Sequence, residues 1–288
     1  MYSYSEIPFQ NQQDCLSSLF LTLGDQIMKV MGRKGETVIR KAVQKFGVSL
    51  GEETREKLKQ EGKRQSLKEL AEQKDLFLDP RFRIMPIRTR QQELWAEVHT
   101  CPIADYMKER EGTGIGLMFC EEFCHAFFKG YTDGKAQANL SKVLMGPFDN
   151  HCRFSIYYRP ANLEADKREQ VFDQETTGEE ADLPDRKLLH NTEWLQKLYL
   201  RLYASLYEEA EALGGKEGIC AIALGLRTLA ETQRKALEKW ASARRMPCDA
   251  AFIEDNYPVQ LDEEKNVFSS YLNKEEETLF RENFLKRF

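Results

Sequence analysis

Apolar residues recur every three or four positions from Cys15 to about Glu72, and this spacing predicts a series of helices. Leu19, Leu23 and Ile27 would share one face of the first helix. Gly32 and Gly35 then interrupt the pattern, because glycine disfavours a helix interior. The sequence therefore predicts one helix before this glycine pair and another after it.

The second helix is predicted to start near Val38 and to be stopped by Gly47. Ser49 is placed to cap a third helix, because a serine oxygen can accept a hydrogen bond from a free N–H of the first turn. A fourth helix is expected over residues 67–71. Four helical segments, joined by short breaks, are thus expected before residue 73.

The pattern changes at Arg83, where short β-branched and aromatic runs predict strands at 84–87 and 94–99. Pro86 favours an edge strand or a strand boundary, because proline cannot donate to a central ladder. Residues 140–145 and 153–159 predict a β-hairpin around the turn 146–150. The alternation of Phe154, Ile156 and Tyr158 would give its second strand one apolar face.

Two helices are expected between these strands. Pro102 favours a short helix towards Lys108, because proline suits a first helical turn. Residues 117–129 predict a longer helix that ends at Gly130, and 111–116 are expected to form a loop. The glycines of this loop do not follow a strand, so a phosphate-binding glycine loop is not favoured.

Together these elements predict an α+β fold in three parts. Residues 1–172 would hold a helical N-terminal layer and a central antiparallel sheet with a cysteine-bearing helix. Residues 173–190 are acidic and contain glycine and proline, which is typical of a linker. Residues 191–288 would form a C-terminal helical region.

The C-terminal helices resemble the N-terminal ones, with 15–80 as the region possibly repeated. A shift of 183 residues pairs Gly32 with Gly215 and Gly35 with Gly218, and also the Leu-Asp pairs at 78–79 and 261–262. Two glycines at equal spacing after an apolar helix predict an internal duplication. The alternative is two unrelated amphipathic hairpins. In either case the cysteine-rich core is not repeated.

Composition excludes several classes. The net charge is −5, and no basic stripe with interleaved aromatics suggests nucleic-acid binding. The N-terminus lacks the pattern of a signal peptide, and no apolar run approaches a membrane span. The seven cysteines are an odd number, which favours free thiols in a reducing cytoplasm. We therefore expect a cytoplasmic protein that binds a small molecule and neither nucleic acid nor membrane; a homodimer is left open.

Four cysteines between positions 101 and 152 are the main candidates for chemistry. Cys120 and Cys124 lie four residues apart, so both would be on one face of a helix. This spacing allows two thiolates to bind one metal ion, zinc or iron, with Cys152 and His151 as further ligands. Taken alone, such a pair is more often two buried core thiols than two metal ligands. The sequence leaves both interpretations open and does not identify a cofactor.

Cys101 is the candidate nucleophile. It precedes Pro102 and a predicted helix start, where backbone N–H groups and the helix dipole would stabilise a thiolate. His99 lies two residues earlier, on the same face if the strand continues, and His125 follows Cys124. Either histidine could act as the base for Cys101.

The order of these motifs is similar to that of a known family. The chain resembles the L-2-amino-thiazoline-4-carboxylic acid hydrolase family in three motifs. These are Val98-His-Thr-Cys101-Pro102, Phe119-Cys120-Glu-Glu-Phe-Cys124 and Cys152-Arg-Phe154. Gly146 with Cys152-Arg-Phe154 is also similar to the 4-vinyl reductase domain, a ligand-binding module. The resemblance covers about residues 15 to 160.

The resemblance implies an activity and a fold. The activity would be the hydrolytic opening of an amino-thiazoline ring at a cyclic C–N bond. The resemblance implies that the functional cysteines of the family correspond to Cys101, Cys120, Cys124 and Cys152. The fold would be α+β, with helices around a ligand pocket. The alternative function is a non-enzymatic sensor that uses the same cysteines for a small molecule or a metal.

Overall fold

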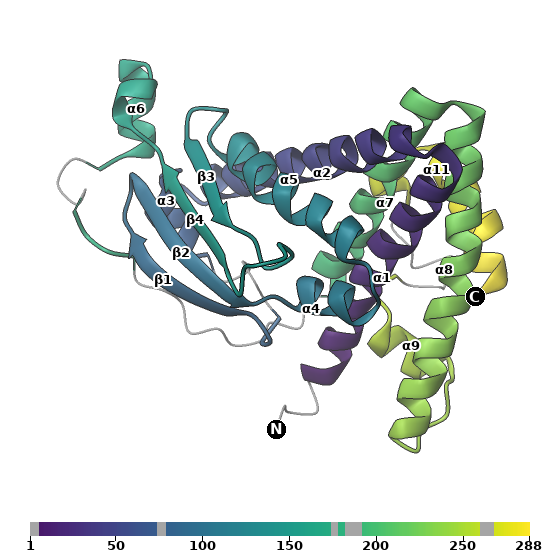
Figure 1. The fold of residues 1–288 in the computed structure, drawn as a ribbon. Coiled ribbons are helices and arrows are strands. Elements are labelled where there is room, and N and C mark those ends of the chain that lie inside the picture. The colour runs from purple at the N-terminus through teal and green to yellow at the C-terminus, as the bar shows by residue number, and fades with distance from the viewer. Residues whose placement is uncertain (1–5, 74–78, 174–177, 182–191, 260–267) are drawn as a thin grey trace. The chain divides into compact units, whose positions relative to one another are not determined.

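The structure, a computed structural model, describes residues 6–73, 79–173, 178–181, 192–259 and 268–288 (Figure 1). Its described residues divide into two compact units that are not continuous in sequence. Unit 1 takes those within Met1–Ala42, Tyr106–Gly116 and His190–Phe288, and unit 2 those within Val43–Asp105 and Leu117–Leu189. The boundaries at 172 and 191 stay a prediction, and the predicted linker is described only at Asp173 and residues 178–181.

Unit 2 is built on a four-stranded antiparallel sheet, which confirms the predicted α+β fold class. The order of the strands is β1-β2-β4-β3, so β1 is an edge strand, as Pro86 predicts. The strands are β1 (Arg83–Thr89), β2 (Glu93–Thr100), β3 (Gln137–Lys142) and β4 (Cys152–Tyr157).

The predicted hairpin is present, with a longer loop between its strands. Strand β3 ends at Lys142, three residues earlier than expected. The reason is local: the N–H of the next residue, Val143, donates to Oδ2 of Asp149 at 3.0 Å instead of to a neighbouring strand. Residues 143–151 therefore form the loop before β4.

One face of the sheet belongs to the core of unit 2. Phe154 and Ile156 of β4 are buried, together with Ala96 of β2, which is paired in register with Phe154. The ring of Phe128, from helix α5 (Thr113–Tyr131), lies 6.5 Å from that of Phe154. The alternation predicted for the hairpin therefore gives the buried face, and helix α5 contributes to its cover.

Helix α2 (Arg33–Gln60) continues through Gly47, so the predicted stop there and the third helix capped by Ser49 are wrong. Gly47 instead lies against α5: a Cβ built on it would lie 2.8 Å from Cβ of Ala126 and 3.0 Å from the carbonyl oxygen of Phe123. A Cβ built on Gly51 of α2 would lie 2.1 Å from the carbonyl oxygen of Phe127, and one on Gly130 would lie 2.1 Å from that of Val48. The glycines allow the two helix backbones to touch.

Helix α5 also differs from its prediction at both ends. It begins at Thr113, inside the predicted loop, and it continues through Gly130 to Tyr131. Gly130 is therefore a contact point and not a helix end. The Tyr131 hydroxyl donates to the carbonyl of Ser66 at 2.8 Å, and Ser66 caps α3 (Leu67–Ala71) as a helix start.

Unit 1 is helical. Its C-terminal helices enclose an aromatic core, with the ring of Phe280 lying 5.1 Å from Tyr203 and 4.9 Å from Phe284. Helix α8 packs on α1. The described helices of unit 1 include α1 (Glu6–Met31), α7 (Thr192–Gly214), α8 (Lys216–Ala243), α9 (Ala250–Asn256), α10 (Phe268–Tyr271) and α11 (Lys274–Asn283), with a short 3-10 turn at Leu285–Arg287. Helix α4 (Pro102–Glu109) is divided between the units, and α6 (Ala165–Val171) and the 3-10 turn Pro160–Asn162 belong to unit 2.

The two helix junctions related by the predicted duplication share local geometry. Gly32 has a φ of 56° and Gly215 a φ of 55°, and the N–H groups of these glycines donate to Met28 and Glu211, which are also 183 residues apart. The positive φ explains the glycines, since other residues rarely adopt it. The duplication itself stays a prediction, and its Leu-Asp matches fall at 78 and 261–262, outside the described residues.

Candidate functional site

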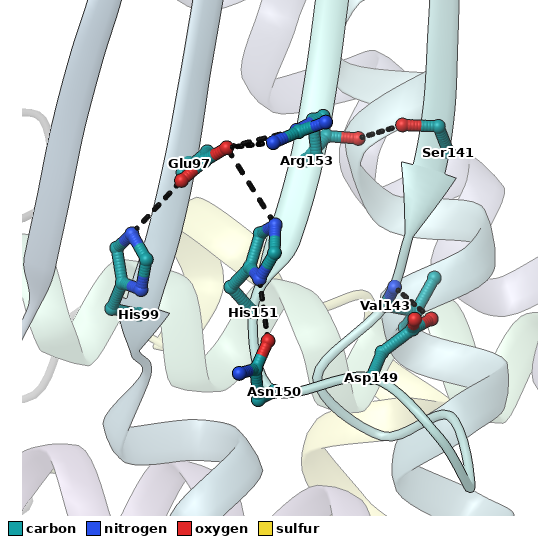
Figure 2. A network of polar contacts seen from close by, with 8 residues as sticks. All are labelled: Glu97, His99, Ser141, Val143, Asp149, Asn150, His151 and Arg153. Carbon is teal, nitrogen blue, oxygen red and sulfur yellow. Dashed lines mark hydrogen bonds and ion pairs between the residues drawn. The ribbon is translucent and has the colours of Figure 1, made fainter.

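The centre of the candidate site is the carboxylate of a buried residue, Glu97 (Figure 2). Glu97 of β2 is paired in register with Arg153 of β4. Its Oε1 accepts a hydrogen bond from Nε of Arg153 at 2.8 Å and a second from Nη2. Although the residue is only 6% exposed, its charge is thus matched by a two-point contact with a guanidinium.

Two histidines contact the same carboxylate. Nε2 of His99 lies 3.0 Å from Oε2 of Glu97, and Nε2 of His151 lies 3.6 Å from Oε1. The imidazole rings are stacked, with centroids 5.2 Å apart. On its other side, Nδ1 of His151 lies 2.7 Å from the amide oxygen of Asn150. One carboxylate therefore holds an arginine and two imidazoles, as Figure 2 shows.

The positive groups around Glu97 lower its pKa. The hydrogen bond from Arg153 is the largest cause, and His151 and His99 act in the same direction against the opposing effect of burial. A carboxylate with a lowered pKa stays charged at more acidic pH than an ordinary glutamate. Because the shift is downward, the stability it provides is complete above the ordinary pKa and is lost as the pH falls through the lowered one.

Strand alternation explains how the site is assembled. Glu97 and His99 are two residues apart on β2, so their side chains project from the same face, while Ala96 and Val98 belong to the buried face. His151 immediately precedes β4, whose residue Arg153 lies opposite Glu97. His99 and His151 were predicted as site residues from the sequence, whereas Glu97 and Arg153 were not. A glutamate alternating with a histidine on a strand was the available signal.

His99 and Cys101 are close in sequence but contact different groups. Strand β2 ends at Thr100 and α4 begins at Pro102, so the strand alternation does not extend to Cys101. His99 contacts Glu97 and His151, whereas the Cys101 thiol interacts with that of Cys152. The sequence predicted a shared face for His99 and Cys101 only if the strand continued, and this condition is not met, because β2 ends before Cys101.

Three of the four core cysteines do come together. The thiol of Cys124 interacts electrostatically with those of Cys152 and Cys101. Cys152 is fixed further by a hydrogen bond that its Sγ accepts from the N–H of Leu144 at 3.2 Å. Cys120 lies one helical turn before Cys124 and is half-buried; its membership of the thiol cluster stays a prediction.

The expected activation of Cys101 is wrong in direction. The N–H groups of Ile103 and Ala104 at the start of α4 do lower the pKa of the thiol, as the helix start predicts, but burial outweighs them and raises it to about 12. Burial likewise raises the pKa of Cys124 to about 12. Both groups are therefore neutral thiols at physiological pH, and a neutral thiol is a poor nucleophile.

Alkylation kinetics test this result. We expect iodoacetamide at pH 7.5 to modify the exposed Cys220 at least about 10²-fold faster than Cys101, because a pKa of about 12 leaves only a minute thiolate fraction. Peptide mapping by mass spectrometry over time gives both rates in one sample. Modification of Cys101 before Cys220 in native protein would contradict the buried, neutral thiol.

The metal interpretation gains no support. Within the described residues, no group of three or more histidine, cysteine, aspartate or glutamate side chains is arranged to hold a metal ion. The carboxylate nearest to two histidines already has Arg153 as its cation. His125, the other candidate base, is exposed on α5. Its predicted catalytic role therefore has no structural support from the Glu97 site.

Fold and site together define an α+β protein with a carboxylate–histidine–arginine cluster on a sheet. Residues 12–154 match the family model of L-2-amino-thiazoline-4-carboxylic acid hydrolase. Through this segment, about half of its length, the chain belongs to that family. Searches of the curated proteins and of the solved structures gave no match. No described helix is long and apolar enough to cross a membrane.

Proposed function

We propose that this protein hydrolyses a cyclic C–N bond in a small molecule of the amino-thiazoline-carboxylate type, with Glu97 and His99 activating the water. The observation that carries the proposal is the contact between the buried Glu97 carboxylate and the half-exposed imidazole of His99. Both residues lie inside the segment that matches the hydrolase family. A carboxylate that orients an imidazole is the arrangement used for general base catalysis in many hydrolases.

The hydrogen bond assigns the roles of the two ring nitrogens of His99. In the neutral imidazole one nitrogen is a donor and the other an acceptor. Because Nε2 faces the Glu97 carboxylate, it carries the proton, and Nδ1 is left with the lone pair. Nδ1 has no hydrogen-bond partner among the described residues, and the side chain is 43% exposed. It can therefore accept a proton from water beside a bound substrate.

The reaction follows from this assignment. Water, deprotonated by Nδ1 of His99, adds its oxygen to the amidine carbon between the ring sulfur and the ring nitrogen. The imidazolium gives this proton to the ring nitrogen. The imidazole then takes the proton of the new hydroxyl group, which becomes a carbonyl, and passes it to the same nitrogen as its bond to the carbon breaks and a primary amine leaves. The product contains one water more than the substrate, carries a new amine and keeps its sulfur bonded to carbon.

Water is a better candidate nucleophile than a thiol in this protein. Burial raises the pKa of the Cys101 thiol to about 12, and among the described residues no hydrogen bond or ion pair joins it to either histidine of the cluster. The sequence-based proposal of a Cys/His pocket is therefore replaced here by a carboxylate–histidine site. Cys101, Cys124 and Cys152, which are half-buried, are assigned a packing role, which free cysteines commonly have.

Incubation of the purified protein with L-2-amino-thiazoline-4-carboxylate tests the proposal. We expect a product 18 Da heavier than the substrate, with a new primary amine and no new thiol, because hydrolysis at the ring C–N bond leaves sulfur substituted. Mass spectrometry, amine derivatisation and a thiol reagent distinguish the outcomes. A free thiol would show cleavage at the C–S bond instead.

The same sample also tests the alternative of a non-enzymatic sensor. Saturable binding of the amino-thiazoline carboxylate without any product would favour a binding protein over a hydrolase. If the protein neither binds nor hydrolyses the amino-thiazoline carboxylate, the proposed substrate class is contradicted. Protein in which His99 is replaced serves as the control for contaminating hydrolase activity.

A further inference from the structure

The Glu97 cluster carries more positive than negative groups on its exposed side. Glu97 is buried, whereas the side chain of Arg153 is 50% exposed and that of His99 is 43% exposed. Lys142 of β3 lies opposite Arg153 after a register shift that follows Leu140, and within the described residues it forms no ion pair. The buried carboxylate is thus already matched, and the exposed groups around it are cationic or neutral.

The other acid near this loop faces elsewhere. Oδ2 of Asp149 accepts the hydrogen bond from the N–H of Val143, and Figure 2 shows its carboxylate turned towards Val143. Among the described residues, Glu97 is therefore the carboxylate that contacts the guanidinium. A small anion placed beside Arg153 would meet positive charge without a competing carboxylate at the exposed side.

The guanidinium has hydrogen-bonding capacity left for such an anion. An arginine presents five N–H donors. Glu97 uses Nε and one donor of Nη2, so Nη1 and the second hydrogen of Nη2 are not used by Glu97. The contact with Glu97 also fixes the plane of the guanidinium, which reduces the ordering that a ligand would have to impose. Planar carboxylates are the groups that such an arginine recognises best.

We propose that Arg153, assisted by Lys142 on the neighbouring strand, binds the carboxylate of the small-molecule ligand. The choice of a heterocyclic amino-acid carboxylate as the ligand rests on the proposed function. Binding at this point holds the ring of the ligand on the same face of the sheet as His99, because Arg153 and His99 both contact Glu97. Arg153 is then a specificity-determining residue as well as the partner of Glu97.

The test compares L-2-amino-thiazoline-4-carboxylate with its uncharged 4-carboxamide in four proteins: wild type, Arg153→Gln, Arg153→Lys and Lys142→Gln. Wild type should favour the carboxylate by about 10- to 100-fold in Kd or kcat/KM, which is the strength of a hydrogen bond to a charged group. Arg153→Gln should remove most of this preference and Arg153→Lys part of it. Because the preference is the ratio of the values for the two ligands in the same protein sample, a lower fraction of folded protein affects both values alike and leaves the ratio unchanged.

Arg159→Gln is the matched control, because Arg159 is an exposed arginine just beyond the same strand and lies over the Tyr157 ring. It should keep the wild-type preference. Calorimetric binding of the two ligands needs no turnover, so it tests the carboxylate site even where the proposed hydrolysis fails. Equal binding of both ligands by the wild-type protein would overturn the proposal without any variant, as would an unchanged preference in Arg153→Gln.

Discussion

Replacing His99 with glutamine should lower kcat for amino-thiazoline hydrolysis by about 10²- to 10⁴-fold, the usual contribution of a general base. Glutamine keeps a side-chain N–H that can donate to Glu97, but it has no basic nitrogen for water. Because the imidazole is expected to act on water and not to bind the substrate, KM should change much less than kcat. Steady-state kinetics at several pH values provide the measurement.

The control for this variant is His125→Gln. His125 is exposed on α5, outside the Glu97 cluster, so its replacement should leave kcat within about 2-fold, as for a surface change away from the site. A comparable loss in both variants would point to a general effect on the protein. Full activity in the His99 variant would exclude this histidine as the base.

Replacing Gly130 with alanine should destabilise the protein by about 3 kcal/mol or more, although alanine normally favours a helix. The added Cβ would lie 2.1 Å from the carbonyl oxygen of Val48 and 2.8 Å from its carbonyl carbon, so the backbones of α2 and α5 must separate. Thermal unfolding followed by circular dichroism should show a Tm lower by roughly 10 °C.

Gly114→Ala on the same helix is the matched control, because nothing lies within 4 Å of a Cβ built there. This change should leave the stability unchanged or raise it by up to about 1 kcal/mol, since alanine is the better helix former. If the Gly130 variant were as stable as the Gly114 variant, the close contact of α2 with α5 would be absent in solution.

The hydrophobic pattern determined the strands and the fold class of unit 2. The alternation of Phe154, Ile156 and Tyr158 reproduces the burial of that strand, because side chains of a strand alternate between two faces whatever lies nearby. The short helix after Pro102 follows equally from local rules, since the preference of proline for a first helical turn depends on its own ring. The spacing of apolar residues and the preference for a first helical turn depend only on residues close in sequence, so both can be read from the sequence.

The glycines show where local rules were insufficient. Gly32 does separate two helices, with a positive φ that an L-residue rarely adopts, and the sequence predicted this break. Gly47 and Gly130 were expected to act in the same way but lie inside continuous helices. The close approach of another helix backbone decides their role, and a distance between two segments far apart in sequence is not a property of either segment.

The candidate site was likewise predicted only in part from the sequence. The sequence identified the histidines and cysteines as the chemical groups, but only the tertiary structure decided which belong together. The pairing of β2 with β4 sets Glu97 opposite Arg153, and the end of β2 at Thr100 separates His99 from Cys101. Burial then raises the pKa of Cys101 against the helix start that lowers it. Residue types and local periods are therefore determined by the sequence, whereas pairing and desolvation depend on segments brought together by folding.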